Sequence, residues 1–295
     1  MNRKMALRGA LLTLLGGMLW GFSGTCGQYL LQVKGLTSEY IVPIRLLCGG
    51  ILLLLMGALK QGKGVLDAMK NDAPGILVFS ILGMAMCQYT YYSAIDASNA
   101  GTATVLQYTS PAMILVWVSL RSRRRPRPVE LAAIALALCG TWLLATHGKP
   151  GSMMLSGDAL FWGLLSAVCL SVCTVQPGRL LAEYGSALVT GWGMLLGGVM
   201  LFVLFRWWAI PAQADAMAVL ALIIVVITGT LAYVVYLEGV RCVGAKKGSL
   251  YASVEPVSAA VFSALLMGAA FAPMDLVGFA CILSTVFLLA ADKKD

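Results

Sequence analysis

Ten apolar stretches, each about as long as a bilayer-spanning helix, dominate this sequence of 295 residues. About 20 consecutive apolar residues cross the hydrocarbon core of a bilayer as an α-helix. Every connection between the stretches is short, so no soluble domain fits between them. We therefore expect an all-α membrane protein with ten transmembrane helices. The stretches cover approximately residues 9–31, 39–59, 74–95, 99–120, 129–146, 157–176, 187–208, 216–237, 247–268 and 273–291.

Composition excludes the soluble and disordered classes. Hydrophobic residues make up 60% of the chain and charged residues 12%, whereas soluble domains carry about 25% charged residues. Disordered chains are poor in apolar residues. The eight cysteines lie mostly inside apolar stretches, where a free cysteine behaves as a small buried hydrophobe. We expect no metal site and no other cofactor.

The distribution of Lys and Arg predicts the orientation in the membrane. Short cytoplasmic connections are enriched in basic residues. With the N-terminus inside, 17 of the 21 basic residues fall in cytoplasmic segments, and only Lys34, Lys149 and Arg206 fall outside, with Arg45 inside a span. The basic excess is thus an orientation signal and does not indicate a nucleic-acid partner. Both termini should be cytoplasmic, in a bacterial-type plasma (inner) membrane.

The second half of the sequence repeats the first. A shift of 145 residues places Pro111 on Pro256 and Pro128 on Pro273, in a register that runs without gaps from residue 91 to residue 145. Residues 1–148 and 149–295 should then form two repeats of five spans each. Because five is odd, the second repeat must enter the membrane upside down. Inverted repeats of this kind are the architecture of many secondary transporters, in which a central cavity opens alternately to the two sides.

Short motifs accompany the two five-span halves. They are Trp20-Gly21 and Trp162-Gly163 in the first and sixth spans, and Tyr108-Thr109-Ser110-Pro111 and Val254-Glu255-Pro256 in the fourth and ninth. Together these features resemble the drug/metabolite transporter superfamily and, within it, the ten-span EamA-type exporters of aromatic and other amino acids, over essentially the whole chain. The resemblance implies export of amino acids or other small metabolites through a central cavity, without ATP. Some relatives import nucleosides, nucleotide-linked sugars or vitamins, so an importer and a multidrug exporter remain alternatives.

An intramembrane enzyme or a membrane scaffold is the alternative outside transport. Residues 21–24, Gly-Phe-Ser-Gly, resemble the serine motif of rhomboid-type proteases, but that chemistry needs a histidine base on a neighbouring helix. The sole histidine, His147, lies at the outer end of the fifth span, and no phosphate-binding loop is present. We therefore expect a transporter and not an enzyme, because a scaffold or enzyme needs no inverted duplicate.

Glu255 is the first candidate for site chemistry. It lies about eight residues inside the ninth span, directly before Pro256. Ionisable residues inside a membrane are costly and usually face a cavity or a partner, and proline removes the helical hydrogen bond to residue 252 and kinks the helix. Pro111 should kink the fourth span in the same way. Since desolvation favours the neutral carboxyl, a proton and a substrate amine would compete for Glu255. The alternative is a protonated carboxyl that only packs.

Arg45 is the second candidate. It lies about six residues inside the second span, two residues after Pro43. It could bind a substrate carboxylate in bidentate geometry, snorkel to the outer headgroups, or pair with Glu39. We favour snorkelling or structural pairing.

A set of aromatic and amide side chains is expected near the membrane midplane. Aromatic rings with one polar group suit amphipathic solutes, so this set and Glu255 should line the cavity for a small-molecule substrate. The remaining partner is the lipid bilayer; the oligomeric state stays open, and a monomer is compatible with the sequence. The set comprises Trp20, Gln88, Tyr89, Gln107, Tyr108, Trp162, Tyr233 and Tyr251.

Overall fold

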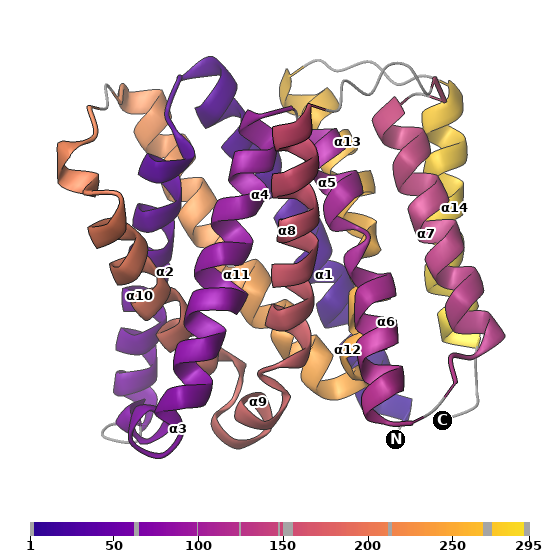
Figure 1. Ribbon diagram of the computed structural model, residues 1–295, viewed down its shortest axis with the longest axis horizontal. Helices are drawn as coiled ribbons and strands as arrows, with labels where there is room; N and C mark the ends of the chain where they lie inside the picture. The colour runs from indigo at the N-terminus through magenta and orange to yellow at the C-terminus, as the bar shows by residue number, and fades with distance from the viewer. Residues whose placement is uncertain are drawn as a thin grey trace.

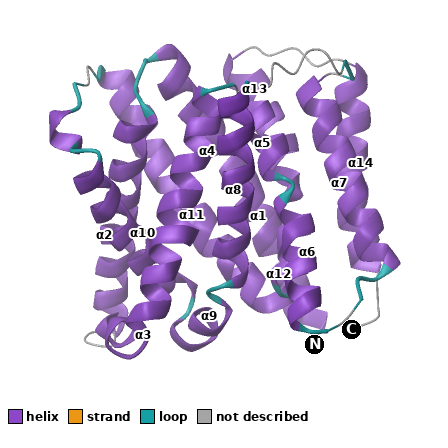
Figure 2. Ribbon diagram, in the orientation of Figure 1, coloured by secondary structure: helices purple, strands orange, loops and turns teal. Residues whose placement is uncertain are grey.

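The computed structural model describes residues 3–61, 65–98, 100–123, 125–146, 148–149, 156–211, 214–267 and 273–291. These residues form a bundle of helices and contain no β-strand (Figures 1 and 2). Two π-helical segments, η1 and η3, and two short 3₁₀ segments, η5 and η6, interrupt or extend the α-helices.

The helices follow the predicted stretches closely. Their bounds are α1 (Arg3–Gln28), η1 (Tyr29–Val33), α2 (Ser38–Gln61), α3 (Asp67–Val78), η3 (Phe79–Ala85), α4 (Met86–Asp96), α5 (Ala100–Gln107), α6 (Ser110–Arg121), α7 (Pro128–Thr146), α8 (Gly157–Val175), α9 (Gly178–Tyr184), α10 (Ser186–Leu204), η5 (Trp207–Ala209), α11 (Ala216–Val243), α12 (Ala245–Tyr251), η6 (Ala252–Val254), α13 (Glu255–Met267) and α14 (Pro273–Ala291).

Seven helices among the described residues are long and apolar enough to cross a membrane. Three shorter apolar helices overlap the remaining predicted stretches. The chain is therefore a multi-span membrane protein. The seven long helices are Lys4–Val33, Ser38–Leu59, Asp67–Asp96, Gly157–Val175, Ser186–Leu204, Ala216–Val243 and Ala245–Leu266, and the shorter ones are Ser110–Arg121, Pro128–Gly140 and Leu276–Thr285.

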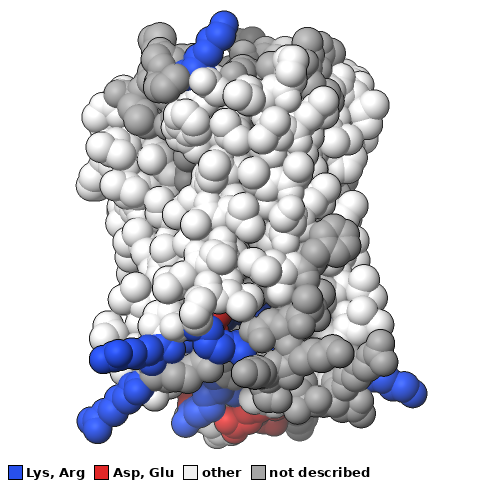
Figure 3. All heavy atoms as spheres, turned by 90° about the vertical axis from the view of Figure 1, so that its right-hand side faces the viewer, with Lys and Arg blue, Asp and Glu red and all other residues white. Residues whose placement is uncertain are grey.

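The outside of the bundle is apolar. Leu59 is 89% exposed, and Leu120 and Leu265 are each 74% exposed. On the face shown in Figure 3, Lys and Arg side chains gather at the end where α1 begins, and the described residues leave a broad uncharged band above them. An apolar surface of this extent would aggregate in water. It fits contact with lipid.

Helix boundaries repeat with the offset that the sequence predicts. The helix α7 spans 128–146 and α14 spans 273–291, which is the same length at an offset of 145 residues. At this offset Ala100, where α5 begins, corresponds to Ala245, where α12 begins. A proline opens both α7 and α14, where its missing N–H costs nothing because the first helical turn has free N–H groups. The same sequence signals thus start the same helices in both halves.

The two proline-containing spans are broken, which differs in detail from the expected kinks. In the first half α5 ends at Gln107 and α6 begins at Ser110. In the second half α12 ends at Tyr251, the 3₁₀ segment η6 follows, and α13 begins at Glu255. Each proline therefore lies in the first turn of the second helix. The break precedes the proline because proline clashes with an α-helical residue before it and withholds a donor from the preceding turn.

The helix α1 lies at the centre of the bundle. It packs along α11 on one side and against η6 and α13 on another, while α2 packs along α10 (Figure 1). Close approach depends on small residues: a Cβ on Gly17 would lie 2.7 Å from the Ala252 carbonyl oxygen. Small residues at such positions let transmembrane helices come together. The helices α7 and α14 pack mainly on each other at one edge of the bundle.

Candidate functional site

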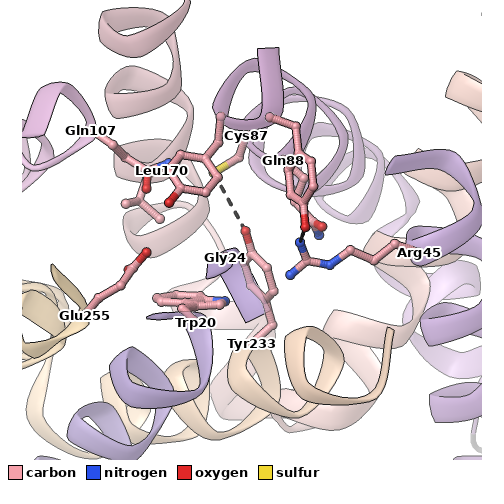
Figure 4. Close-up of a pocket in the computed structure, with 11 residues that line it drawn as sticks. Trp20, Gly24, Arg45, Cys87, Gln88, Gln107, Leu170, Tyr233 and Glu255 are labelled. Carbon is pink, nitrogen blue, oxygen red and sulfur yellow. Dashed lines mark hydrogen bonds between the residues drawn. The ribbon is translucent and has the colours of Figure 1, made fainter. Parts of the chain in front are cut away.

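A small cavity of about 30 Å³ lies in the middle of the bundle. Side chains from seven helices of both halves face it, namely α1, α2, α4, α5, α8, α11 and α13 (Figure 4). Its walls carry two ionisable groups of opposite sign, together with amides, phenols and an indole. The lining residues are Trp20, Gly24, Arg45, Cys87, Gln88, Tyr91, Tyr92, Gln107, Leu170, Tyr233 and Glu255.

The two broken helices meet beside this cavity. Tyr108 lies in the break between α5 and α6, and its hydroxyl lies 2.6 Å from the carbonyl oxygen of Ala252 in η6. Pro256 has no N–H, so the Ala252 carbonyl four residues earlier lacks its α-helical donor and instead accepts from the Glu255 N–H in the 3₁₀ turn of η6. The Tyr108 hydroxyl is a second donor to this carbonyl. Buried carbonyls freed by proline need such a replacement inside a membrane.

Glu255 opens α13 and faces the cavity with a side chain that is 5% exposed. Its Oε2 lies 3.1 Å from the Tyr108 hydroxyl, which can donate to it. A phenol has one proton, and the Ala252 carbonyl is the nearer of its two acceptors. A proton on the Glu255 carboxyl would let both short contacts be hydrogen bonds at once. Without that proton, the single Tyr108 proton serves only one of the two acceptors.

Arg45 does not snorkel, and it does not pair with Glu39. Its residue is 4% exposed, its Nη1 donates to the Tyr92 hydroxyl at 2.9 Å, and its guanidinium carbon lies 5.5 Å from the centre of the Tyr92 ring. Glu39 instead accepts a hydrogen bond from the Tyr89 hydroxyl at 3.0 Å. Arg45 stays inside the bundle for a physical reason. Tyr92 on α4 offers a buried acceptor and an aromatic face, which together hold the guanidinium inside the bundle.

Four buried polar atoms around the cavity have no hydrogen-bond partner. They are Nε1 of Trp20, Nε of Arg45, and both Nε2 and Oε1 of Gln88. Buried polar groups are nearly always satisfied in folded proteins, and each exception calls for an explanation. All four belong to residues that line this cavity. They are the groups that a polar solute or a few water molecules would satisfy.

The structure brings together six of the predicted site residues and separates three from them. Tyr108 does not line the cavity, but its hydroxyl lies 3.1 Å from Oε2 of Glu255, which does. Tyr89 and Trp162 form an edge-to-face pair with ring centres 5.7 Å apart, away from the cavity lining. Tyr251 packs in a separate apolar cluster with Leu115 and Ala133. The six residues that line the cavity are Trp20, Arg45, Gln88, Gln107, Tyr233 and Glu255.

Sequence reasoning missed several lining residues. Tyr91 and Tyr92 follow Gln88 by three and four positions on α4, and residues at these spacings share one face of a helix. The polar groups on this one face of an apolar helix could have indicated that both tyrosines line the cavity with Gln88. Gly24, Cys87 and Leu170 gave no chemical signal of their own.

Comparisons with known proteins agree with this architecture. A profile of the EamA-like transporter family matches residues 7–146 and again residues 158–291. The uncharacterized inner membrane transporter YicL of Salmonella typhimurium (strain LT2) is 38% identical over 290 residues, which cover 97% of this chain and 96% of YicL. The threonine/homoserine exporter RhtA of Escherichia coli (strain K12) is 24% identical over 219 residues, which cover 70% of this chain and 68% of RhtA.

A solved crystal structure shares the fold. It is 19% identical, covers 98% of this chain and 97% of its own, and superposes with a TM-score of 0.74. The double match to the family profile spans nearly the whole chain and coincides with the two halves found in the sequence. The chain therefore belongs to the EamA-like transporter family, within the drug/metabolite transporter superfamily.

Proposed function

We propose that this protein is a secondary active transporter that exports amino acids or similar small amphipathic metabolites by alternating access, without an enzymatic step. The observation that carries the proposal is a small central cavity with several polar side chains in its wall, flanked by two helices that break at equivalent places in the two halves. Discontinuous helices near the midplane, at the interface of repeats, are typical of substrate sites in secondary transporters.

Ten membrane crossings in two inverted repeats, residues 1–148 and 149–295, are part of the proposal. The start of α1 and the end of α14 lie at the same end of the bundle (Figure 1), as an even number of crossings requires. Basic side chains gather at that end on the face in Figure 3. A cytoplasmic excess of Lys and Arg supports placing both termini in the cytoplasm of a cell with a bacterial inner membrane.

The present structure fits a closed stage of the transport cycle. Pockets for small molecules have volumes of roughly 300–1,000 Å³, whereas this cavity measures about 30 Å³. Entry of a solute therefore needs a rearrangement. Ion pairs join the first span to α11 at both of its ends: Lys34 with Asp215 at one end, and Arg8 with Glu238 at the other. Opening to either side would separate one pair while the other pair holds.

Glu255 is proposed as the coupling group. A proton and a substrate amine cannot both occupy one carboxyl, and an alternating-access carrier needs only mutually exclusive loads to perform antiport. Tyr108 connects this carboxyl to the carbonyl at the break of the second half. A change of load on Glu255 would thus alter a contact between the two broken helices.

Amino acids fit the cavity by charge and by polarity. Glu255 offers a site for an amine, Arg45 offers a site for a carboxylate, and the rings of Trp20 and Tyr233 lie between them (Figure 4). The relative RhtA, a threonine/homoserine exporter, handles solutes of the same class.

Counterflow in proteoliposomes tests the proposal. Purified protein is reconstituted with an unlabelled solute inside, and uptake of the labelled solute is followed for amino acids, nucleosides and cationic drugs. We expect protein-dependent exchange of at least one neutral amino acid, and none in protein-free vesicles. Absence of exchange for all amino acids, with exchange of a nucleoside or drug, would assign the carrier another substrate.

A further inference from the structure

One wall of the cavity carries a buried positive charge without a negative partner. Arg45 is 4% exposed and forms no ion pair within the described part of the chain, and its Nε has no hydrogen-bond partner. Glu255 faces the same cavity but is not paired with it. Charges inside membrane proteins are usually paired. The guanidinium thus lacks an anionic partner among the described residues.

Gln88 adds neutral hydrogen-bonding groups to the same wall. It is 2% exposed, and neither atom of its amide has a partner. In Figure 4 the Gln88 amide and the Arg45 guanidinium lie on one side of the cavity, and the Glu255 carboxyl lies on the other side. An amide N–H beside a guanidinium N–H is a donor pair that suits the two oxygens of a carboxylate.

The guanidinium is held in place by its surroundings. Its Nη1 donates to the Tyr92 hydroxyl at 2.9 Å, with the guanidinium over the Tyr92 ring. On the other side lies Gly229 of α11, where a Cβ would overlap Nη2 and would lie 2.6 Å from Cζ. Glycine at this position leaves the space that the charged group occupies. A preorganised donor loses little conformational freedom on binding.

We propose that Arg45 and Gln88 form a carboxylate subsite, in which Arg45 Nε and the Gln88 amide donate to the carboxylate of the transported solute. The inference rests on the proposed transport function, because it assigns one end of the substrate to one wall of the same cavity. Glu255, on the opposite wall, takes the ammonium. The carrier then selects zwitterions and rejects molecules that lack either charge.

Matched solutes test this assignment. Neutral amino acids of small, branched and aromatic type are compared with their methyl esters, which lack the carboxylate, and with their N-acetyl forms, which lack the ammonium. Inhibition of amino-acid counterflow is measured in proteoliposomes. We expect the esters to inhibit about 10- to 100-fold less well than the parent amino acids, as for loss of a hydrogen bond to a charged group.

Variants locate the effect. Arg45→Gln should bring the inhibition constants of amino acid and ester together, while the preference over the N-acetyl form persists. Gln88→Leu should also lower the preference for the amino acid over its ester, but by a smaller factor than Arg45→Gln does. Gln32→Leu, at an exposed amide that is bonded only to Gln28, is the matched control and should change neither ratio.

A second variant keeps the test independent of the folding of Arg45 variants. Gly229→Ala leaves Arg45 in the chain but displaces its guanidinium, so the preference for acid over ester should fall about tenfold or more. Gly75→Ala is its control, because a Cβ there would make ordinary contacts of 3.5 Å with Leu180.

The outcomes separate the two proposals. Esters that inhibit as well as their parent amino acids in the wild type, or an unchanged ratio in both Arg45→Gln and Gly229→Ala, would overturn the carboxylate subsite while transport stands. No exchange of any solute by the wild type would instead contradict the proposed function, and with it the subsite.

Discussion

The hydroxyl of Tyr108 lies 2.6 Å from the carbonyl oxygen of Ala252 and joins the break in one half of the protein to the break in the other. Pro256 leaves that carbonyl without its α-helical donor, and the Glu255 N–H donates to it in a 3₁₀ turn instead. The same hydroxyl lies 3.1 Å from Glu255 in the cavity wall. One side chain therefore links the two halves, the proline break and the buried carboxyl.

Tyr108→Phe should lower both stability and transport. The substitution removes the hydroxyl that donates to Ala252 and contacts Glu255, while the Glu255 N–H still donates to the Ala252 carbonyl, so the loss should be that of one hydrogen bond, about 0.5–1.5 kcal/mol. Thermal unfolding in detergent and counterflow in proteoliposomes measure the two effects. Tyr40→Phe is the control, because the Tyr40 ring stacks on Trp207 and its hydroxyl has no partner among the described residues. Equal stability of both variants would contradict the role given to the Tyr108 hydroxyl.

Pro256→Ala should raise stability and slow turnover. Alanine restores an N–H that can donate to the Ala252 carbonyl, which favours a continuous helix over the break. The midpoint of thermal unfolding should rise while the maximal rate of counterflow falls. Pro211→Ala, in an exposed segment outside the helices, should change neither. Unchanged turnover in Pro256→Ala would mean that the break does not take part in the transport cycle.

Much of the fold was readable from the sequence because the membrane imposes simple rules. Apolar length gave the helix positions, and prolines at an offset of 145 residues gave the repeat. The sequence did not predict the form of the breaks, since a proline is compatible with a kinked helix as well as with an interrupted one. The interrupted form depends on tertiary packing, in which Tyr108 from the other half donates to the Ala252 carbonyl.

The site was readable only in part, because spacing along one helix does not show which helices meet. Glu255 and Trp20 were found from depth and residue type. Arg45 was misjudged, since its partner Tyr92 lies 47 positions away on α4. Tyr251 has the right depth, yet its helix turns it into a separate apolar cluster. Tertiary contacts of this kind leave no periodic signal in the sequence.

The ion pair between Lys34 and Asp215 should stabilise one end of the bundle in a pH-dependent way. The hydrogen bond from Lys34 lowers the pKa of Asp215 below its usual value of 3.8, and the same bond raises the pKa of Lys34 above 10.5. A carboxyl with a lowered pKa stabilises the fold above its unfolded pKa and loses that effect as the pH falls through the folded value. The ammonium with a raised pKa loses its effect as the pH rises.

Asp215→Asn tests this pair. The variant should unfold at a lower temperature than the wild type at neutral pH, and the difference should vanish well below the usual Asp range. Asn keeps the cap on α11, where Asp215 Oδ1 accepts from the Ala218 N–H at 2.8 Å. If the difference in unfolding temperature persists at acidic pH, it comes from the cap hydrogen bond of residue 215 and not from its charge.

Topology can be measured by cysteine labelling. Single cysteines at Arg125 and Lys149, both exposed, are introduced into a variant that lacks the eight native cysteines. An impermeant reagent added to intact cells should label position 149 and spare position 125. Labelling at 125 and not at 149 would reverse the orientation derived from the basic residues.

The most direct measurement is the pH dependence of amino-acid counterflow in wild type and Glu255→Gln. Glutamine keeps the size of the side chain but cannot titrate or carry the charge that faces the ammonium, so the variant should fold, retain some but weaker substrate binding and lose the pH dependence of transport. Glu183→Gln, at an exposed carboxylate on α9, should behave like the wild type. A Glu255→Gln variant whose transport keeps the wild-type pH dependence would contradict the account, because the coupling carboxyl would then lie elsewhere.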